Sequence, residues 1–160
     1  MKTIPLTQGL YATVDDEDFD RLNQYKWKVV RGHRTFYAIR QLSTNGKYKS
    51  IYMHREILGL QDRKVEADHI DHNGLNNTRQ NLRPATRSEN LQNTSSRPGS
   101  SSKYLGVWLD KATNRWAASV KLGKTIVFVG RFTDETAAAR ARDKVAKKLH
   151  GKFANLNFKL

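Results

Sequence analysis

The chain has 160 residues, a formal net charge of +14 at pH 7 and a sequence pI of about 10.2. A positive charge of this size exceeds what solubility needs and indicates a polyanionic partner, first of all double-stranded DNA. The absence of cysteine excludes disulfides and thiolate metal sites, so any metal would need oxygen or imidazole ligands. The sequence contains neither an apolar signal core nor an apolar run that could span a bilayer, which predicts a soluble, cytoplasmic protein without membrane contact.

Residues 1–60 are rich in short β-strand patterns, with two short helices. The acidic run at residues 15–20 suits the first turn of a helix that includes Phe19, Leu22 and Tyr25, and a metal site there is the less favoured alternative. Strands are predicted at residues 10–14, 27–30, 35–42 and 49–53, with turns at Gly32 and at Asn45-Gly46. Residues 54–60 are predicted to form a second helix that Gly59 ends.

Residues 66–93 concentrate the polar chemistry of the chain. The patterns predict a strand at residues 65–69, a turn-rich loop at 71–77 and a second strand at 81–84. Thr86 and Glu89 have the spacing of a capping box, so a helix should begin at Thr86. The predicted order is therefore strand, loop, strand and helix.

Residues 94–103 have the composition of a flexible linker, with several serines and Pro98-Gly99. The pattern after the linker predicts three antiparallel strands at residues 104–109, 116–122 and 126–132, and a helix at 133–150. This helix is expected to pack through an apolar stripe formed by Ala137, Ala141, Val145 and Leu149. The charge is also uneven, because residues 94–160 carry 14 basic against 4 acidic side chains and residues 1–93 carry 15 against 11.

Hydrolysis of a phosphodiester needs an activated water, neutralisation of phosphate charge and help for the leaving oxygen. Asp68 and His69 are adjacent on a predicted strand, so their side chains should point to opposite faces, the carboxylate to a metal and the imidazole to water. Asn90 offers the metal a neutral oxygen, and an acceptor near Asn81 could fix the imidazole tautomer. A structural role for His69 is the alternative for the Asp-His pair taken alone.

The segment MHREILG and the core DHID…NN…NLRPATRSENLQN together resemble the HNH nucleases, in the phage and intron-homing branch whose third histidine is asparagine. The resemblance implies a ββα-metal fold, with His69 as general base, Asp68 and Asn90 as ligands of Mg²⁺ or Mn²⁺, and Asn81 as the residue that orients His69. A degenerate copy that only binds DNA is the alternative. Arg79, Arg83 and Arg87 are candidates for phosphate contacts, against a solvated basic face.

Other polar residues around this core have weaker interpretations. His54 is expected to pack or to contact a phosphate rather than to catalyse. His72 is expected to face solvent. Asp71 is as consistent with a carboxylate behind the metal ligands as with an ordinary loop residue.

Residues 102–158 resemble the DNA-binding domain of plant ethylene-response factors (Apetala-2 type) through SKYLGVWLD, RWAASVKL, VGRF, the following helix and FANLNF. The resemblance implies a three-stranded sheet in the major groove with a helix behind it. The arginines with which plant members contact bases are replaced here, for example by Trp108 and Ile126. The sequence predicts core positions for Trp116, Phe128 and Phe132, and a solvated face for Arg140, Arg142, Lys147 and Lys148. The candidate DNA contacts of this part are Trp108, Lys111, Arg115, Lys121, Lys124 and Arg131, with Ser119 as a further candidate.

The expected fold class is α+β. The expected parts are a DNA-contacting region at 1–60, the HNH motif at 61–93, a linker at 94–103 and the ethylene-response-factor-type domain at 104–160. The predicted function is a site-directed, homing-type DNA endonuclease of a bacterial or phage-infected cell, which nicks as a monomer or breaks both strands as a homodimer. A non-cutting transcriptional regulator is the alternative.

Overall fold

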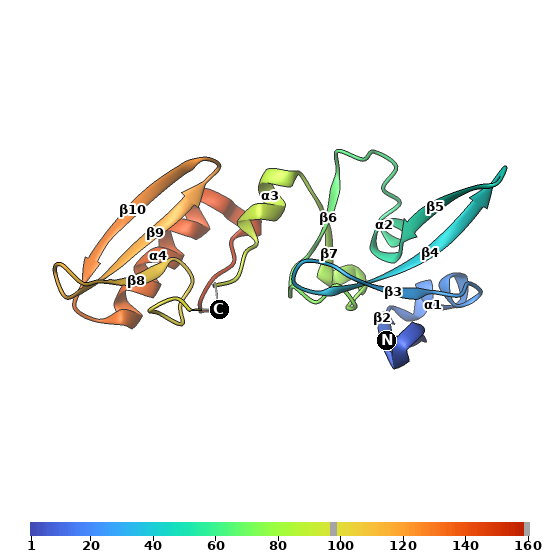
Figure 1. Cartoon of the computed structure of the whole chain (residues 1–160). Coiled ribbons are helices and arrows are strands. Elements are labelled where there is room, and N and C mark those ends of the chain that lie inside the picture. Colours follow the sequence, from blue (N-terminus) through green and yellow to red (C-terminus); the bar gives the residue numbers. More distant parts are fainter. Residues whose placement is uncertain (97–98, 159–160) are drawn as a thin grey trace. The chain divides into compact units, whose positions relative to one another are not determined.

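The computed structural model describes residues 1–96 and 99–158 and has an α+β fold of small sheets and short helices (Figure 1). The chain divides into two compact units, Met1–Arg87 and Ser88–Leu160. Residues 1–60 and most of the predicted HNH motif thus share the first unit. Arg97-Pro98 of the predicted linker lies outside the described residues. None of the helices in the described part of the chain is both long and apolar enough to cross a membrane.

The first unit contains three small antiparallel sheets. Its strands are β1 Lys2–Pro5, β2 Tyr11–Val14, β3 Lys28–Arg31, β4 Phe36–Thr44, β5 Lys47–Tyr52, β6 Glu66–His69 and β7 Leu82–Ala85. Its helices are α1 Asp16–Asn23 and α2 Met53–Ile57, and α3 Arg87–Gln92 begins at the end of this unit. The strand at β1 is not predicted, although Ile4 pairs with Ala12 of β2 and is buried in the core.

Local sequence explains two of the chain reversals in the first unit. Asn45 and Gly46 link β4 to β5 with φ angles of 50° and 74°, a left-handed pair that glycine and asparagine adopt at low cost and that matches strand twist. Helix α1 ends at Asn23, so the prediction that Tyr25 is helical is wrong. The Leu22 carbonyl accepts from the Tyr25 N–H at 3.2 Å and from the Trp27 indole Nε1 at 2.8 Å, so a tightened last turn and a side-chain bond satisfy this carbonyl where the helix ends.

The core of the first unit lies between these sheets and the two helices. Its buried side chains are Ile4, Leu6, Ala12, Val14, Leu22, Trp27, Ala38, Met53, Ile57 and Leu82. Because Met53 and Ile57 come from α2 and Leu82 from β7, this core fixes the β6–β7 pair against the β4–β5 hairpin. Gly74, in the loop between β6 and β7, lies so close to Phe36 and Tyr37 that a Cβ atom there would clash with both.

The second unit is a three-stranded antiparallel sheet with one long helix against one face (Figure 1). The strands are β8 Val107–Asp110, β9 Arg115–Leu122 and β10 Thr125–Phe132, and the helix is α4 Glu135–His150. Trp116 and Phe132 pack against the core of Val107, Ala118, Ala138 and Ala139, which confirms their predicted core positions. Phe128 is exposed, so its predicted place in the core is wrong. Side chains alternate along β10, and a bulge shifts the register between Phe128 and Gly130. Phe128 therefore lies on the sheet face away from α4, whereas Val127 lies on the face toward it.

The buried face of α4 is not the predicted stripe. Ala138, Ala139, Arg142, Asp143, Ala146 and His150 are the buried residues, whereas Ala137 is not buried. Arg142 is only 4% exposed and donates to the Asn155 carbonyl and to Asp143, so the predicted solvated face is wrong for this residue. The C-terminal segment supplies the partners that sequence periodicity cannot show, since Phe158 N–H also donates to Asp143 at 2.9 Å.

Part of the predicted linker is attached to the second unit. Ser102 is buried, and its hydroxyl donates to Glu135 at 2.7 Å while accepting from the Tyr104 N–H at 3.0 Å. Ser101 Oγ accepts from the Leu109 N–H at 2.9 Å. The serine hydroxyls here accept from backbone N–H groups and donate to the Glu135 side chain of α4. A serine-rich composition is therefore found in an ordered segment here as well as in flexible linkers.

Candidate active site

Strand β6 carries Asp68 and His69 side by side, and both are buried, with 3% and 7% of their surface exposed. The antiparallel register places Asp68 opposite Arg83 and His69 opposite Leu82 of β7. Because neighbouring side chains of a strand point to opposite faces, the carboxylate and the imidazole meet different surroundings. The strand, loop and strand follow one another in the order the sequence predicts, and α3 follows β7.

The Asp68 carboxylate forms a two-pronged ion pair with Arg83. Nε and Nη2 of Arg83 lie 2.7 Å and 2.6 Å from the same carboxylate oxygen, Oδ2. A buried carboxylate is costly unless a countercharge and hydrogen bonds replace its hydration, and the planar guanidinium supplies both. Arg83, a candidate phosphate contact in the sequence, is thus directed at the proposed metal ligand.

His69 is placed by an asparagine that the sequence did not single out. Its Nε2 lies 3.3 Å from Oδ1 of Asn77, a fully buried residue whose own amide donates to the Gly74 carbonyl. An amide oxygen only accepts, so this bond requires the tautomer with hydrogen on Nε2 and the lone pair on Nδ1. Burial lowers the pKa of His69, although the Asn77 hydrogen bond and the Asp71 and Asp68 charges act in the opposite direction. The imidazole is therefore neutral at neutral pH.

His69 belongs to a cluster of four rings with Tyr37, Tyr52 and His54. The centroid of His54 lies 5.1 Å from that of His69 with nearly perpendicular planes, and Tyr37 lies 5.9 Å from His69. Burial lowers the pKa of His54 to about 3, and its Nδ1 is buried without a hydrogen bond among the described residues. The rings of Tyr37 and His54 pack against His69 and restrict the orientation of its imidazole, which agrees with a packing role for His54.

Asn81 joins the start of strand β7 to the loop that follows β6. Its Nδ2 donates to Asp71 at 2.9 Å and to the Asn76 carbonyl at 2.8 Å, and its Oδ1 accepts from the Asp71 N–H at 3.0 Å. Burial disfavours ionised Asp71, but hydrogen bonds from Asn76, the Asn73 backbone and Asn81 outweigh it and lower the Asp71 pKa. Several of the spaced asparagines thus close this loop, which holds Asn77 beside His69.

Asn90, the second predicted metal ligand, lies half-buried on α3 and belongs to the second unit. Within residues 1–96 and 99–158, no group of three or more His, Asp or Glu side chains is arranged to hold a metal ion. The Asp68 carboxylate is by its chemistry a ligand suited to a hard divalent cation that keeps several waters.

Two further arginines near β6 and β7 also contact carboxylates. Arg79 lies 2.6 Å from Glu17 and 2.8 Å from the buried Asp18, and the Asp18 hydrogen bond is the main cause of its raised pKa. The acidic run of α1 therefore anchors the loop before β7 in addition to starting a helix. Arg87 lies 3.5 Å from Glu66, and its side chain is largely exposed.

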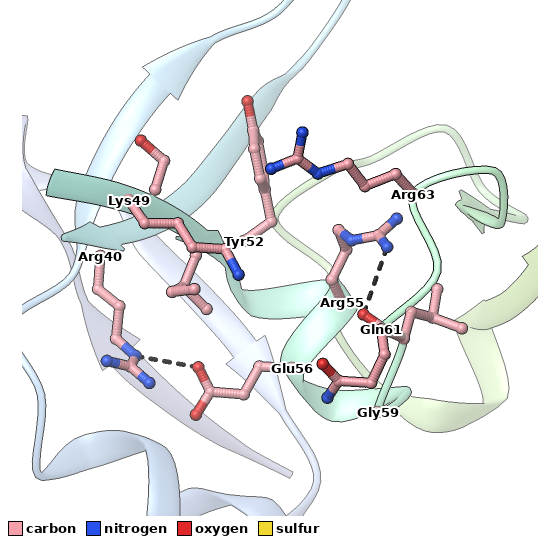
Figure 2. Close-up of a pocket in the computed structure, with 11 residues that line it drawn as sticks. Arg40, Lys49, Tyr52, Arg55, Glu56, Gly59, Gln61 and Arg63 are labelled. Carbon is pink, nitrogen blue, oxygen red and sulfur yellow. Dashed lines mark hydrogen bonds and ion pairs between the residues drawn. The ribbon is translucent and has the colours of Figure 1, made fainter. Parts of the chain in front are cut away.

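The first unit also contains an open groove of about 670 Å³ between β4, β5, α2 and the loop after α2 (Figure 2). Arg40 and Arg55 line it, but Glu56 accepts from Arg40 at 3.0 Å and the Val65 carbonyl accepts from Arg55 at 2.6 Å. Lys49 and Arg63 add exposed positive charge, and the figure shows Arg63 projecting toward Tyr52. A basic groove with an aromatic wall can bind a nucleic-acid backbone.

The second unit places most of its predicted DNA contacts on one surface. Trp108, Arg115, Lys121 and Arg131 project from the sheet face opposite α4, and Lys111 and Lys124 lie in the turns that flank β9. Arg131 donates to Asp110 at 2.7 Å, and this bond lowers the Asp110 pKa. Arg115 is the register partner of the same Asp110, so this one carboxylate faces two of the cations on the sheet.

Comparison with known proteins adds two similarities, whereas no family model matches the chain. Residues 102–158 carry the resemblance described above, and over 60 residues the chain is 43% identical to APETALA2-like protein 2 of Oryza sativa, in both the indica and japonica subspecies. That match covers 36% of this chain and 14% of the rice protein. An uncharacterized HNH endonuclease of Acanthamoeba polyphaga mimivirus is 33% identical over 151 residues, which cover 94% of this chain and 76% of the viral protein. The buried Asp-His strand and this near full-length similarity together identify the chain as a member of the HNH endonuclease family.

Proposed function

We propose that this chain is a site-directed, homing-type DNA endonuclease that hydrolyses phosphodiester bonds with one divalent metal ion and His69 as the general base. The observation that carries the proposal is a buried imidazole, held by Asn77 and adjacent to a buried carboxylate on the same short strand. In the proposed arrangement, β6, β7 and α3 form a ββα-metal motif. The similarity to the viral HNH endonuclease supports the reaction class.

The base step follows from the tautomer of His69. With its Nε2 hydrogen bonded to Asn77, His69 accepts a proton from water on Nδ1 as the water oxygen forms a bond to phosphorus and the bond from phosphorus to the leaving oxygen breaks. The depressed pKa keeps the imidazole unprotonated before the step. The side-chain amide oxygen of Asn77 and the packed rings of Tyr37 and His54 then stabilise one orientation of the resulting imidazolium.

Asp68 and Asn90 are the proposed holders of Mg²⁺ or Mn²⁺. When bound, the ion neutralises phosphate charge and assists departure of the leaving oxygen. Arg83 supplies the positive countercharge to Asp68, and we propose that it shares this carboxylate with the ion or turns to the phosphate as DNA enters.

DNA binding is assigned chiefly to the second unit. Residues 88–160 carry 14 basic against 5 acidic side chains, a net charge of +9, and the sheet face opposite α4 is rich in cations. The groove with Lys49 and Arg63 would add contacts in the first unit. One active site per chain should nick one strand, and a homodimer would break both.

The direct test uses the full chain, supercoiled plasmid and Mg²⁺ or Mn²⁺. Conversion to relaxed circles that EDTA prevents is expected from the wild type and not from His69→Ala. Plasmids of several unrelated sequences that all stay supercoiled with either metal, while the protein still binds them, would contradict the endonuclease and favour the non-cutting regulator. Mapping the ends on genomic DNA tests site direction, since scattered ends contradict it.

A further inference from the structure

The sheet face of the second unit that points away from α4 carries three large, exposed apolar side chains on its two edge strands, β8 and β10. Trp108, Phe128 and Ile126 are 38%, 52% and 68% exposed. The register puts Trp108 beside Ala117, Phe128 beside Ser119 and Ile126 beside Lys121, so all of them project from the same face. Folding of the unit does not bury these side chains, because its core forms on the opposite face around Val107 and Ala118.

One cation of this face, Arg131 on the edge strand β10, is already engaged within the protein. Arg131 lies in the row of Trp108 and Ala117, where it donates to Asp110 at 2.7 Å and its guanidinium lies 5.3 Å from the Phe128 ring centroid. A guanidinium held in this way is poorly placed to form the two-pronged hydrogen bonds that recognise guanine. The large exposed apolar side chains of this face therefore lie on the edge strands β8 and β10, on either side of the small residues Ala117 and Ser119 of the central strand. Arg115 and Lys121 supply positive charge nearer the ends of that central strand, and Lys124 supplies it on the adjoining turn.

We infer that this face recognises thymine methyl groups in the major groove of A·T-rich DNA. The net charge of +9 on residues 88–160 selects a polyanion as the partner, and the major groove is wide enough for a β-ribbon. Among the groups that base pairs present in that groove, the C5-methyl of thymine is the apolar one. Phe128, Ile126 and Trp108 would cover these methyls while the cations contact the flanking phosphates. The inference rests on the proposed DNA-binding role of this unit and names the bases it prefers.

The test compares thymine with deoxyuridine, which lacks only the methyl group. A duplex is first selected from a random pool by the full-length protein in EDTA, so that no cleavage intervenes, and is then synthesised with thymine or with deoxyuridine throughout. Binding is measured by fluorescence anisotropy at one salt concentration. Loss of one buried methyl corresponds to roughly a fourfold loss of affinity, so two contacts give more than about tenfold. The selected duplexes should also be rich in A·T pairs.

Two variants test whether the exposed apolar side chains of β10 cause the preference for thymine. Phe128→Ala and Ile126→Ala should each reduce the preference for the thymine duplex, and the double variant should reduce it further. Both positions are exposed, so the melting temperature should not change. Lys121→Ala is the matched control on the neighbouring strand. It should weaken binding to both duplexes by the same factor and preserve the thymine preference.

Each outcome is decisive. Equal affinity of the wild type for the thymine and deoxyuridine duplexes overturns methyl recognition and leaves the DNA-binding role standing. Failure to bind either duplex overturns the DNA-binding role and the inference together. If the wild type is a dimer in gel filtration that Phe128→Ala converts to a monomer without changing DNA affinity, the face is an interface between copies of this chain and the inference is wrong.

Discussion

The two units use their basic residues in different ways. In residues 1–87, where 15 basic side chains accompany 10 acidic ones, arginines form close internal ion pairs, such as Arg79 with Asp18 and Arg83 with Asp68. In residues 88–160 the ratio is 14 to 5. The cations there lie on α4, on the sheet face opposite α4 and in the turns that flank β9, and Arg142 of α4 is buried with Asp143. A net charge therefore indicates a binding surface only where acids are too few to neutralise it.

The largest expected effect comes from removing the proposed general base, which should separate cleavage, assigned to the first unit, from DNA binding, assigned chiefly to the second. His69→Ala should lower the cleavage rate about 10²- to 10⁴-fold, because general base catalysis contributes on that order. DNA affinity in EDTA should stay within about twofold, since phosphate contacts dominate affinity. Single-turnover nicking and anisotropy measure the two effects. His72→Asn, three residues along in the exposed loop and tolerant of the positive φ there, is the matched control that should keep the wild-type rate. A His69→Ala protein that still nicks at the wild-type rate contradicts the base assignment.

Ion pairs in the two units should differ in their contribution to stability. Arg83→Met leaves the buried Asp68 without its countercharge and should cost about 3–5 kcal/mol, whereas Arg131→Met breaks an exposed pair and should cost at most about 1 kcal/mol. Urea unfolding followed by fluorescence and circular dichroism measures both losses of stability. If the two units unfold in separate transitions, each transition is fitted by itself. Combining Arg83→Met with Asp68→Asn should recover part of the loss. Equal costs for the two single variants would show that burial does not distinguish the units.

The salt dependence of binding tests where DNA is held. Removal of one phosphate-binding cation should lower the slope of log affinity against log salt by about 0.9, so Arg115→Ala, Lys121→Ala and Lys124→Ala together should lower it by about 2.7. In the groove of the first unit, Lys49→Ala with Arg63→Ala should lower it by at most about 1.8. Titration by anisotropy over a salt series gives both slopes. If the double variant of the groove changes this slope more than the triple variant does, most phosphate contacts lie in the first unit.

Acid should destabilise the first unit through its buried histidines. Burial holds the pKa of His54 at about 3 and also lowers that of His69 below the ordinary value of 6.5, so in acid the unfolded chain binds protons that the folded chain does not. Stability is therefore complete above pH 6.5 and falls as the pH drops toward 3, by at most about 1.4 kcal/mol per pH unit for each group. His54→Gln should flatten this dependence in urea unfolding, with His33→Gln on a turn as the control. An unchanged slope in His54→Gln would contradict burial of a neutral His54.

Local sequence was sufficient for most of the fold. The Asn45-Gly46 turn, the strands around residues 66–69 and 82–85 and helix α4 were predicted near their observed bounds, because turn chemistry, alternation and helix capping act within a few residues. The same logic failed at α1, where Trp27 ends the helix by a side-chain bond to Leu22. It also failed for β1, whose strand character depends on pairing with β2.

The candidate site was predictable in its chemistry and less so in its contacts. Asp68 and His69 were identified from their adjacency and from the segment around them, yet nothing in the pair Asn76-Asn77 showed that Asn77 would be the one to contact His69. That choice depends on how the loop closes over Gly74 and on the bonds that Asn81 makes to Asp71 and Asn76. The role of Asp18 was equally hidden, because its partner Arg79 lies 61 residues away in the chain.

The amino-acid order alone determined the family, the basic character of the second unit and the candidate residues for phosphodiester hydrolysis, since these depend on residue type and spacing. Tertiary structure decided which arginines are paired with carboxylates inside the protein, which face of α4 is buried, and that Phe128 is exposed while Arg142 is not. The physical reason is that burial and ion pairing compete for the same side chains. The outcome depends on which groups the folded backbone brings within a few ångströms, and no local pattern contains that information.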